Sequence, residues 1–334
     1  MSKATNREFT FIDLFAGIGG MRIPFQKLGG ECLLTSEIDE YAYKTYSANF
    51  EGHHDYIPDV TDIDESTLPE HDVLLAGFPC QPYSIAGLRK GLDDVRGGHI
   101  FKKLISILSA PNKPNMFLME NVKGIRSSPG TLEYMRAQFD EAGFILRDRV
   151  MNTKLHTFIP QNRERVFFVG FNKEIYSNLG DTIETFEFPG MLSGNTRGTI
   201  TDFLEQDRVD EKYYYDGRYE CTAQLEEAIP KDSCGTTLYQ WRRKYVRENK
   251  DQSCPTLTAN MGSGGHNVPL LRDATGRIRK LTPRECANFQ GFGEDFMLPA
   301  DISDNRLYHQ LGNSVTVPLV GRIAENMIAQ LRNK

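Results

Sequence analysis

The sequence has no apolar run near the ~18 residues that a helix needs to span a bilayer. Its first eight residues are polar and lead directly into an apolar segment, so we expect no signal peptide. The six cysteines are widely scattered and form no Cys-x-x-Cys pair. This spacing excludes a disulfide framework and a structural zinc site, and favours a reducing compartment. Internal repeats and low-complexity segments are missing too. We therefore expect a soluble cytoplasmic protein without a bound metal.

A positive net charge is also missing, since the formal charge is −6. An acidic total does not favour a nucleic-acid partner, but it does not exclude one, because only a local basic face is required. The 334 residues are 39% hydrophobic and 25% charged, as in an ordinary globular protein. This length predicts two domains, or one domain with a large insertion.

Segments rich in β-branched and aromatic residues alternate with segments of helical apolar spacing between residues 9 and 171. Strands are expected at residues 9–15, 32–36, 73–76, 116–119 and 165–171, with a further short strand just before residue 59. This alternation predicts an α/β fold with a doubly wound, mostly parallel sheet of the Rossmann-like kind.

Two later segments depart from this pattern. Residues 189–280 are rich in Gly, Thr, Tyr, Asp and Arg, which predicts a smaller, irregular, β-rich domain. Residues 281–334 turn helical again and are expected to return to the first domain. The predicted organisation is thus a first domain over residues 1–188, a second over 189–280 and a returning segment over 281–334.

A glycine turn, Gly17-Ile18-Gly19-Gly20, joins the first expected strand to a helix. It lets the backbone pass close to a ligand. The dinucleotide fingerprint would need a further glycine where the chain has Arg22, so a cofactor with a pyrophosphate is disfavoured. Glu37 and Asp59 close the next two strands, where carboxylates can accept from ribose hydroxyls and from an adenine amino group. Two acids without a phosphate-binding lysine fit a cationic nucleoside such as S-adenosylmethionine.

Cys80 lies just past the apolar run 72–76, within Gly77-Phe78-Pro79-Cys80-Gln81-Pro82-Tyr83-Ser84. This places a thiol at the carboxyl end of a parallel strand, where open α/β sheets bind their ligands. Two interpretations stand: a small apolar residue that ends the strand, or a positioned nucleophile. Glu120 follows another expected strand and has the same ambiguity, as a solvated acid or as a functional one.

Six short motifs follow one another along the chain. They are Phe15-Ala16-Gly17-Ile18-Gly19-Gly20, Gly77-Phe78-Pro79-Cys80-Gln81, Glu120-Asn121-Val122, Gln161-Asn162-Arg163-Glu164-Arg165, Arg284-Glu285-Cys286-Ala287 and Gly312-Asn313-Ser314-Val315. In this order they resemble the motifs of DNA (cytosine-5)-methyltransferases, especially bacterial type II restriction–modification methylases. The resemblance spans about residues 10 to 320. It implies methyl transfer from S-adenosylmethionine to carbon 5 of a cytosine in double-stranded DNA, with S-adenosylhomocysteine as product and no metal.

The resemblance also implies roles for the residues of the site. The thiolate of Cys80 would attack carbon 6 of a cytosine that is extruded from the duplex. Glu120 would contact ring nitrogen 3 and the exocyclic amine, and Arg163 and Arg165 would favour the thiolate. Because they are separated by one residue and lead into the expected strand 165–171, the two arginines should point to the same face.

The binding residues follow from the same motifs. Cofactor binding is expected from Phe15, Ala16, Gly17, Ile18, Gly19, Gly20, Glu37, Ile38, Asp59, Val60, Pro79, Asn313 and Ser314. DNA binding is expected from Ser84, Arg89, Lys90, Arg96, Gln240, Trp241, Arg242, Arg243, Thr256 and Leu257. Residues 84–98 suit a loop that closes on DNA, or an ordinary flexible loop. Residues 239–247 suit phosphate and base contacts, or an exposed basic strand.

Three other functions compete with this interpretation. They are a transfer RNA cytosine-5 methyltransferase, a DNA-binding protein that has lost catalysis, and a nicotinamide dehydrogenase. Arg22 opposes the dehydrogenase, and the presence of all four expected catalytic residues opposes the silent binding protein. We expect a monomer in the bacterial cytoplasm whose partner is double-stranded DNA. Any cognate restriction endonuclease would act in the same system without a stable complex.

Overall fold

The computed structural model describes residues 8–50, 52, 54–79, 98–127, 130–176, 186–193, 197–206, 209–217, 219–262 and 268–332. Cys80 and the expected DNA contacts Ser84, Arg89, Lys90 and Arg96 lie outside these residues. The chain divides into two compact units. The first comprises Met1–Met151, Glu164–Pro189 and Val320–Lys334, and the second comprises Asn152–Arg163 and Gly190–Leu319. No helix of the described residues is long and apolar enough to cross a membrane.

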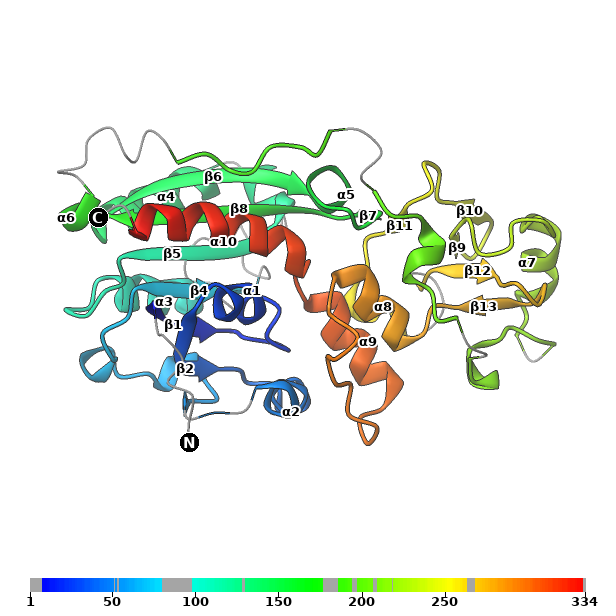
Figure 1. Ribbon diagram of the computed structural model, residues 1–334, viewed down its shortest axis with the longest axis horizontal. Coiled ribbons are helices and arrows are strands. Elements are labelled where there is room, and N and C mark those ends of the chain that lie inside the picture. Colours follow the sequence, from blue (N-terminus) through cyan, green and yellow to red (C-terminus); the bar gives the residue numbers. More distant parts are fainter. Residues whose placement is uncertain are drawn as a thin grey trace. The chain divides into compact units, whose positions relative to one another are not determined.

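A seven-stranded sheet forms the centre of the first unit (Figure 1). In spatial order its strands are β3 (Asp55–Tyr56), β2 (Gly30–Ser36), β1 (Phe9–Leu14), β4 (Val73–Ala76), β5 (Met116–Val122), β8 (Glu164–Asn172) and β6 (Phe144–Asn152). The strands from β3 to β5 run parallel, whereas β8 runs antiparallel to β5. The strand order reverses between β1 and β4, and open α/β sheets bind ligands at such a switch point. The predicted fold class is confirmed.

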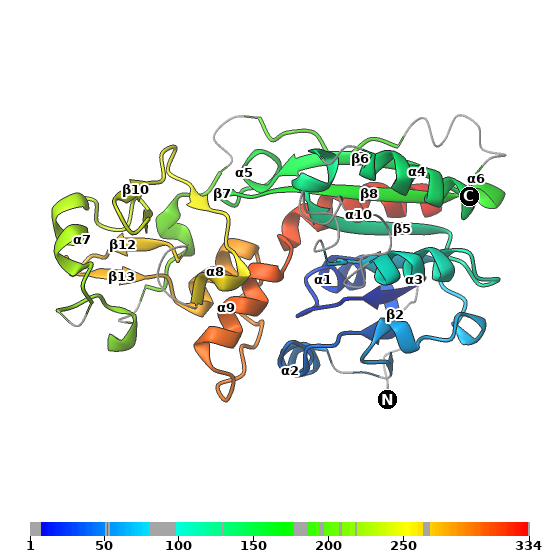
Figure 2. The same cartoon turned by 180° about the vertical axis from the view of Figure 1, so that it is seen from behind.

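Helices cover both faces of this sheet (Figures 1 and 2). On one face lie α3 (Gly98–Leu108) and α4 (Thr131–Glu141), which bury Phe101, Leu104 and Phe139 against the strands. On the other lie α1 (Arg22–Lys27) and the part of α10 (Val317–Arg332) that belongs to this unit. The unit also contains α2 (Glu40–Asn49) and α6 (Lys173–Tyr176). A parallel sheet needs apolar cover on both faces, and every residue of β1 and β4 is buried.

The second unit contains a separate antiparallel sheet. Its strands, in spatial order, are β10 (Val246–Glu248), β9 (Tyr239–Trp241), β12 (Leu270–Arg272) and β13 (Ile278–Lys280). A short parallel pair joins β7 (Gln161–Asn162) to β11 (Cys254–Pro255). The helices are α5 (Thr153–His156), α7 (Thr222–Ala228), α8 (Pro283–Gln290) and α9 (Asp304–Asn313).

The bounds of the units differ from the predicted domains. Residues 281–319 remain in the second unit, and the chain returns to the first only at Val320. Contacts within the second unit hold residues 281–319 there. The Tyr308 hydroxyl of α9 donates to the Leu281 carbonyl at 2.5 Å. At Gly312 an added Cβ would lie 2.2 Å from the backbone of Thr258, so α9 packs directly against that segment. Residues 152–163 also join this unit through the β7–β11 pair.

A buried ion pair connects β13 to α8 within the second unit. Both terminal nitrogens of Arg279 donate to the Glu285 carboxylate, at 2.7 and 2.8 Å. The side chains are 4% and 0% exposed. The same carboxylate accepts from the amide of Thr282, the N-terminal cap of α8, at 2.9 Å. The Arg284-Glu285-Cys286-Ala287 motif therefore has a structural role at Glu285.

Glu285→Gln should destabilise the protein by about 3–5 kcal/mol, because the buried Arg279 guanidinium loses its bidentate partner and keeps only the Asp273 carboxylate, 3.7 Å from its Nε. Urea unfolding followed by circular dichroism measures the loss. Glu227→Gln changes an exposed glutamate of α7 in the same way and should stay within about 0.5 kcal/mol of wild type. Equal stability of the two variants would contradict this account of the ion pair.

Candidate active site and nucleic-acid interface

The glycine turn follows β1 with unusual backbone angles. Phe15, Gly17 and Gly19 have φ values of 55°, 56° and 85°. A Cβ at Gly19 would lie 2.1 Å from the Phe50 ring, so only glycine fits there. A Cβ at Gly17 would meet nothing within 4 Å, so the turn is open on that side. The turn thus leaves room for a ligand beside its backbone.

Glu37 closes β2 and lies against this turn. One carboxylate oxygen accepts from the Gly17 amide at 2.7 Å, and the other from the Asp39 amide at 2.8 Å. Burial raises the pKa of Glu37, and these two hydrogen bonds oppose the increase. The next side chain, Ile38, is 71% exposed. An acid and an exposed apolar group therefore lie together at the carboxyl end of β2.

Asp59 follows β3 at the same edge of the sheet. Its carboxylate accepts from the amide and the hydroxyl of Thr61, at 2.9 and 2.8 Å. These hydrogen bonds lower its pKa. The neighbouring Val60 is buried. The open glycine turn, the two carboxylates and Ile38 fit S-adenosylmethionine, with a carboxylate available for the ribose and another for the base.

Glu120 and Arg165 form an ion pair in the first unit. The Arg165 Nε lies 2.9 Å from a Glu120 carboxylate oxygen, and the side chains are 16% and 11% exposed. The strand register brings them together, because Glu120 pairs with Phe167 and Val122 pairs with Arg165. Diagonal neighbours of an antiparallel pair share a face. The ion pair therefore places the expected proton-sharing acid beside a fixed cation.

The segment that leads to Cys80 is anchored next to this pair. The side-chain amide of Asn121 donates to the Phe78 carbonyl at 2.9 Å, and both groups are buried. Pro79, the last residue before Cys80, is exposed. The chain thus enters the Cys80 segment directly beside the strand that carries Glu120.

Arg163 has different surroundings from Arg165. Its guanidinium donates to the carbonyls of Leu257, Gly312 and Ser314, at 2.7, 3.1 and 2.5 Å. These partners all belong to the second unit, and Arg163 is 2% exposed. The structure thus gives Arg163 a packing role that the sequence did not predict, and its contact with a substrate stays a prediction. Asn313 and Ser314 also lie in the second unit, so their contact with a cofactor stays a prediction.

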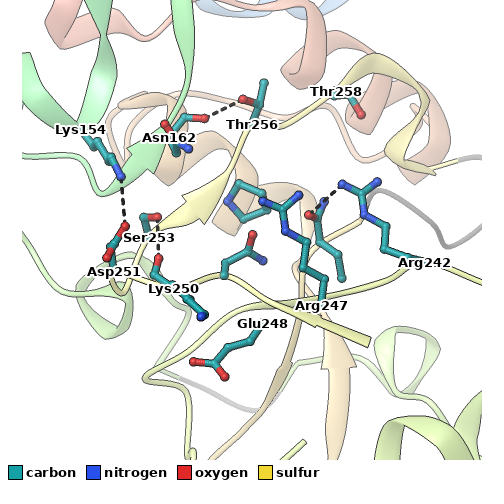
Figure 3. Close-up of a pocket in the computed structure, with 13 residues that line it drawn as sticks. Lys154, Asn162, Arg242, Arg247, Glu248, Lys250, Asp251, Ser253, Thr256 and Thr258 are labelled. Atoms are coloured by element: carbon teal, nitrogen blue, oxygen red, sulfur yellow. Dashed lines mark hydrogen bonds and ion pairs between the residues drawn. The ribbon is translucent and has the colours of Figure 1, made fainter. Parts of the chain in front are cut away.

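A cleft of about 700 Å³ opens within the second unit (Figure 3). Three of the expected DNA contacts, Gln240, Arg242 and Thr256, line it. Sequence reasoning had not placed Lys154 and Lys250 there, whereas Arg247 belongs to the expected basic stretch 239–247. The remaining lining residues are Asn162, Glu248, Asn249, Asp251, Ser253, Pro255 and Thr258.

The β9–β10 hairpin presents cations to this cleft. Arg247 of β10 pairs directly with Gln240 of β9, so their side chains share one face, and Arg242 lies two residues after Gln240. Arg242 donates to the Gln240 side chain at 3.4 Å. Lys154 lies on the other side of the drawn cleft, 3.8 Å from Asp251 (Figure 3). The cleft therefore combines cations with amides that can read base edges.

The other expected DNA contacts lie differently. Arg243 is exposed and has a φ of 63° in the hairpin turn, whereas the half-buried Trp241 donates to Gln224 at 3.1 Å. Leu257 is fully buried, and its carbonyl accepts from Arg163. The structure thus places its side chain in the core, and a contact between Leu257 and DNA stays a prediction. The sequence around Leu257, which precedes a glycine-rich segment, does not indicate whether this side chain is buried in the core or exposed at the surface.

The sheet order, the glycine turn and the strand-end acids are typical of a Rossmann-like, S-adenosylmethionine-dependent methyltransferase. Residues 9–329 match the family model of the C-5 cytosine-specific DNA methylases. The chain belongs to this family. Its reaction is therefore methyl transfer to carbon 5 of cytosine in DNA. In the described residues, no group of three or more His, Cys, Asp or Glu side chains could hold a metal.

Relatives agree with this assignment, and a solved structure has a similar fold. The chain is 43% identical to Type II methyltransferase M.Bsp6I of Bacillus sp. (strain RFL6), over 94% of this chain and 96% of the relative. It is 35% identical to Type II methyltransferase M.HpaII of Haemophilus parainfluenzae, over 98% and 91%. The fold resembles the Entamoeba histolytica methyltransferase EhMeth, with a TM-score of 0.75, 18% identity, and coverage of 98% of this chain and 99% of that chain.

Proposed function

We propose that the enzyme methylates one cytosine within a specific sequence of double-stranded DNA. A base within a duplex is inaccessible, so the target cytosine must leave the helix and enter the site. We place that site at the carboxyl ends of β4 and β5, beside Glu120 and the segment that leads to Cys80. The observation that carries this proposal is the Glu120–Arg165 ion pair, next to the anchored Phe78 carbonyl.

The chemistry requires a nucleophile because carbon 5 of cytosine is poorly reactive. Addition of the Cys80 thiolate to carbon 6 moves an electron pair toward carbon 5, while nitrogen 3 shares a proton with Glu120. S-adenosylmethionine supplies the methyl sulfonium when it is bound. After carbon 5 has taken the methyl group, loss of its proton expels the thiolate and restores both the aromatic ring and Cys80. Arg165 orients Glu120 throughout.

We assign a positioning role to Arg163. Its hydrogen bonds to the carbonyls of Leu257, Gly312 and Ser314 link three distant stretches of the second unit. Buried carbonyls need donors, and a guanidinium can satisfy several at once. The contacts support a role in shaping this unit, in addition to any effect of its charge on the Cys80 thiol.

Transfer of labelled methyl from S-adenosylmethionine to a library of defined duplexes tests the function. Bisulfite sequencing then maps the product, and we expect conversion-resistant cytosines at one sequence. Incorporation into transfer RNA transcripts but not into duplex DNA would favour the rival RNA enzyme. Absence of any transfer, with duplex binding retained, would favour the catalytically silent DNA-binding protein.

We further propose that the cleft of the second unit forms part of the DNA interface. Lysine and arginine side chains contact phosphates, and arginine or glutamine side chains can hydrogen-bond base edges in the major groove. Arg242, Arg247, Lys154 and Gln240 supply these groups in one cleft. Their arrangement supports sequence readout by this unit.

Arg242→Ala and Arg243→Ala should each weaken DNA binding and flatten its salt dependence. The slope of log K against log salt is negative, and every lost phosphate contact makes it less steep by about 0.9. Fluorescence anisotropy with a labelled duplex at several salt concentrations measures the slope. Lys231→Ala removes an exposed cation of the same unit outside the cleft and serves as the matched control. Arg242 lines the cleft and Arg243 lies in the adjoining hairpin turn, so slopes that stay at the wild-type value in both variants would refute this placement of the interface.

We also propose the biological setting. The similar proteins are named as Type II methyltransferases, which supports a place in a bacterial restriction–modification system. The enzyme would act as a cytoplasmic monomer on DNA. A cognate endonuclease, where one exists, would recognise the same DNA sequence but would not form a stable complex with the methyltransferase.

A further inference from the structure

Arg22 occupies the position where a dinucleotide-binding turn would carry its third glycine. It begins α1, directly after the glycine turn, and is only 4% exposed. A large cation is expensive to bury unless its surroundings compensate for the lost water. The surroundings of Arg22 therefore indicate what this residue does.

Aromatic rings surround the Arg22 guanidinium. Its central carbon lies 4.5 Å from the centre of the Phe50 ring and 5.2 Å from that of Tyr46. A cation over an aromatic face is stabilised by the ring's quadrupole, and more strongly when the pair is desolvated. The same Phe50 ring fills the space that a Cβ at Gly19 would need. Arg22 thus holds a ring that packs directly on the glycine turn.

Hydrogen bonds extend from Arg22 to the second ligand-bearing segment. Its Nη1 donates to the Tyr46 hydroxyl at 2.8 Å, and this hydroxyl lies 2.7 Å from the Thr35 hydroxyl. Thr35 belongs to β2, two residues before Glu37. The Nε donates to Gln26 at 3.0 Å, which fixes the guanidinium along α1.

A buried acid accompanies this group. Asp13 of β1 is 1% exposed, and one of its carboxylate oxygens has no hydrogen-bond partner. Burial raises the pKa of Asp13 to about 7, and the nearby Arg22 charge opposes that increase. The cluster therefore lies behind both the glycine turn and Glu37, and joins β1, β2, α1 and α2.

We propose that Arg22 is a positioning residue for S-adenosylmethionine, which couples the glycine turn to the end of β2 so that both present one preformed binding surface. This inference rests on the cofactor assignment made above. Binding groups must be held within about 0.5 Å of their working geometry by the residues behind them. Arg22 supplies such support through the Phe50 ring on one side and the Tyr46–Thr35 pair on the other. It does not need to contact the cofactor.

Arg22→Met keeps the length of the side chain but removes its charge and its donors. Loss of hydrogen bonds made by a charged group predicts a roughly 10- to 100-fold weaker affinity for S-adenosylmethionine, measured by titration calorimetry without DNA. The turnover rate at saturating cofactor should stay within about threefold of wild type, because the reacting groups lie elsewhere. Tyr46→Phe keeps the ring and removes the bridging hydroxyl, so its effect should have the same direction and be smaller. Lys27→Met removes an exposed cation of the same helix and should bind as wild type does.

The outcomes separate this inference from a general loss of stability and from the proposed function. Calorimetry reports the affinity of the folded fraction, and urea unfolding without cofactor reports the stability. An affinity of Arg22→Met within twofold of wild type would overturn the inference, as would a lower turnover rate with unchanged affinity. Wild-type protein that binds the cofactor but methylates no DNA would overturn the proposed function and leave this test valid. Wild-type protein that binds no S-adenosylmethionine would overturn the inference itself.

Discussion

Cys80→Ser is expected to abolish methyl transfer while DNA binding and cofactor binding persist. The hydroxyl of serine loses its proton far less readily than a thiol, so at neutral pH it offers almost no anion to attack carbon 6. Without that addition carbon 5 gains no electron density, and binding groups cannot replace the missing covalent step. Filter-binding assays with labelled S-adenosylmethionine and the mapped duplex measure the loss.

A second cysteine provides the control for Cys80→Ser. Cys234→Ser changes an exposed thiol of the second unit and should transfer methyl groups at the wild-type rate. Duplexes containing 5-fluorocytosine add an independent readout: fluorine replaces the carbon-5 proton whose loss would expel the thiolate, so the thiol adduct should accumulate. Turnover of Cys80→Ser at the wild-type rate would overturn the nucleophilic mechanism.

Glu120→Gln is expected to lower the methyl-transfer rate by about 10²- to 10⁴-fold, the range for removal of a general acid or base. A glutamine matches the shape of the glutamate but cannot share a proton with nitrogen 3. It also leaves Arg165 without its carboxylate partner, 2.9 Å away in the wild type. Single-turnover kinetics at saturating cofactor isolate the chemical step.

The matched variant is Glu133→Gln, in which an exposed glutamate of α4 undergoes the same change. It should retain the wild-type rate. If Glu120→Gln were to react as fast as Glu133→Gln, the proton-sharing role of Glu120 would have to be abandoned.

The parallel strands could be predicted because they are buried on both faces and are therefore apolar throughout. β1 and β4 are examples, with every residue buried. β6 was not predicted, because its sequence mixes apolar residues with Arg147, Asp148 and Arg149, as suits an edge strand. β5 was expected to end before Glu120 but continues to Val122, since the antiparallel partner β8 pairs with its last residues. Such pairing depends on residues over 40 positions away.

The site was predictable where its residues follow strands. Glu37 follows β2 and Glu120 lies on β5 of the same sheet, and the order of the motifs along the chain pointed to both residues. Arg163 and Arg165 look equivalent in the sequence, yet one forms an ion pair with Glu120 and the other binds three carbonyls. The carbonyl partners of Arg163 lie between 94 and 151 residues along the chain, so no local pattern could reveal them.

The cleft of the second unit illustrates the same limit. The cations of the β9–β10 hairpin were visible as a basic stretch, but Lys154 precedes them by more than 80 residues and joins the cleft only through folding. Likewise, the sequence indicated only that Arg22 stands where the dinucleotide fingerprint would require a glycine. Its aromatic partners Tyr46 and Phe50 come from the next helix and its end, which the sequence did not connect with it.

The late arrival of α10 in the chain has a consequence for synthesis on the ribosome. All strands of the central sheet are complete once residue 172 has been made, but α10 joins this unit only from Val320. Its residues Val320, Ile323, Ala324 and Met327 are fully buried. At about 5–20 residues per second, roughly 7 to 30 s separate these two points. During that interval one face of the nascent sheet is covered by α1 but not by α10, so the apolar surface that α10 later buries is exposed to aggregation until the last helix emerges.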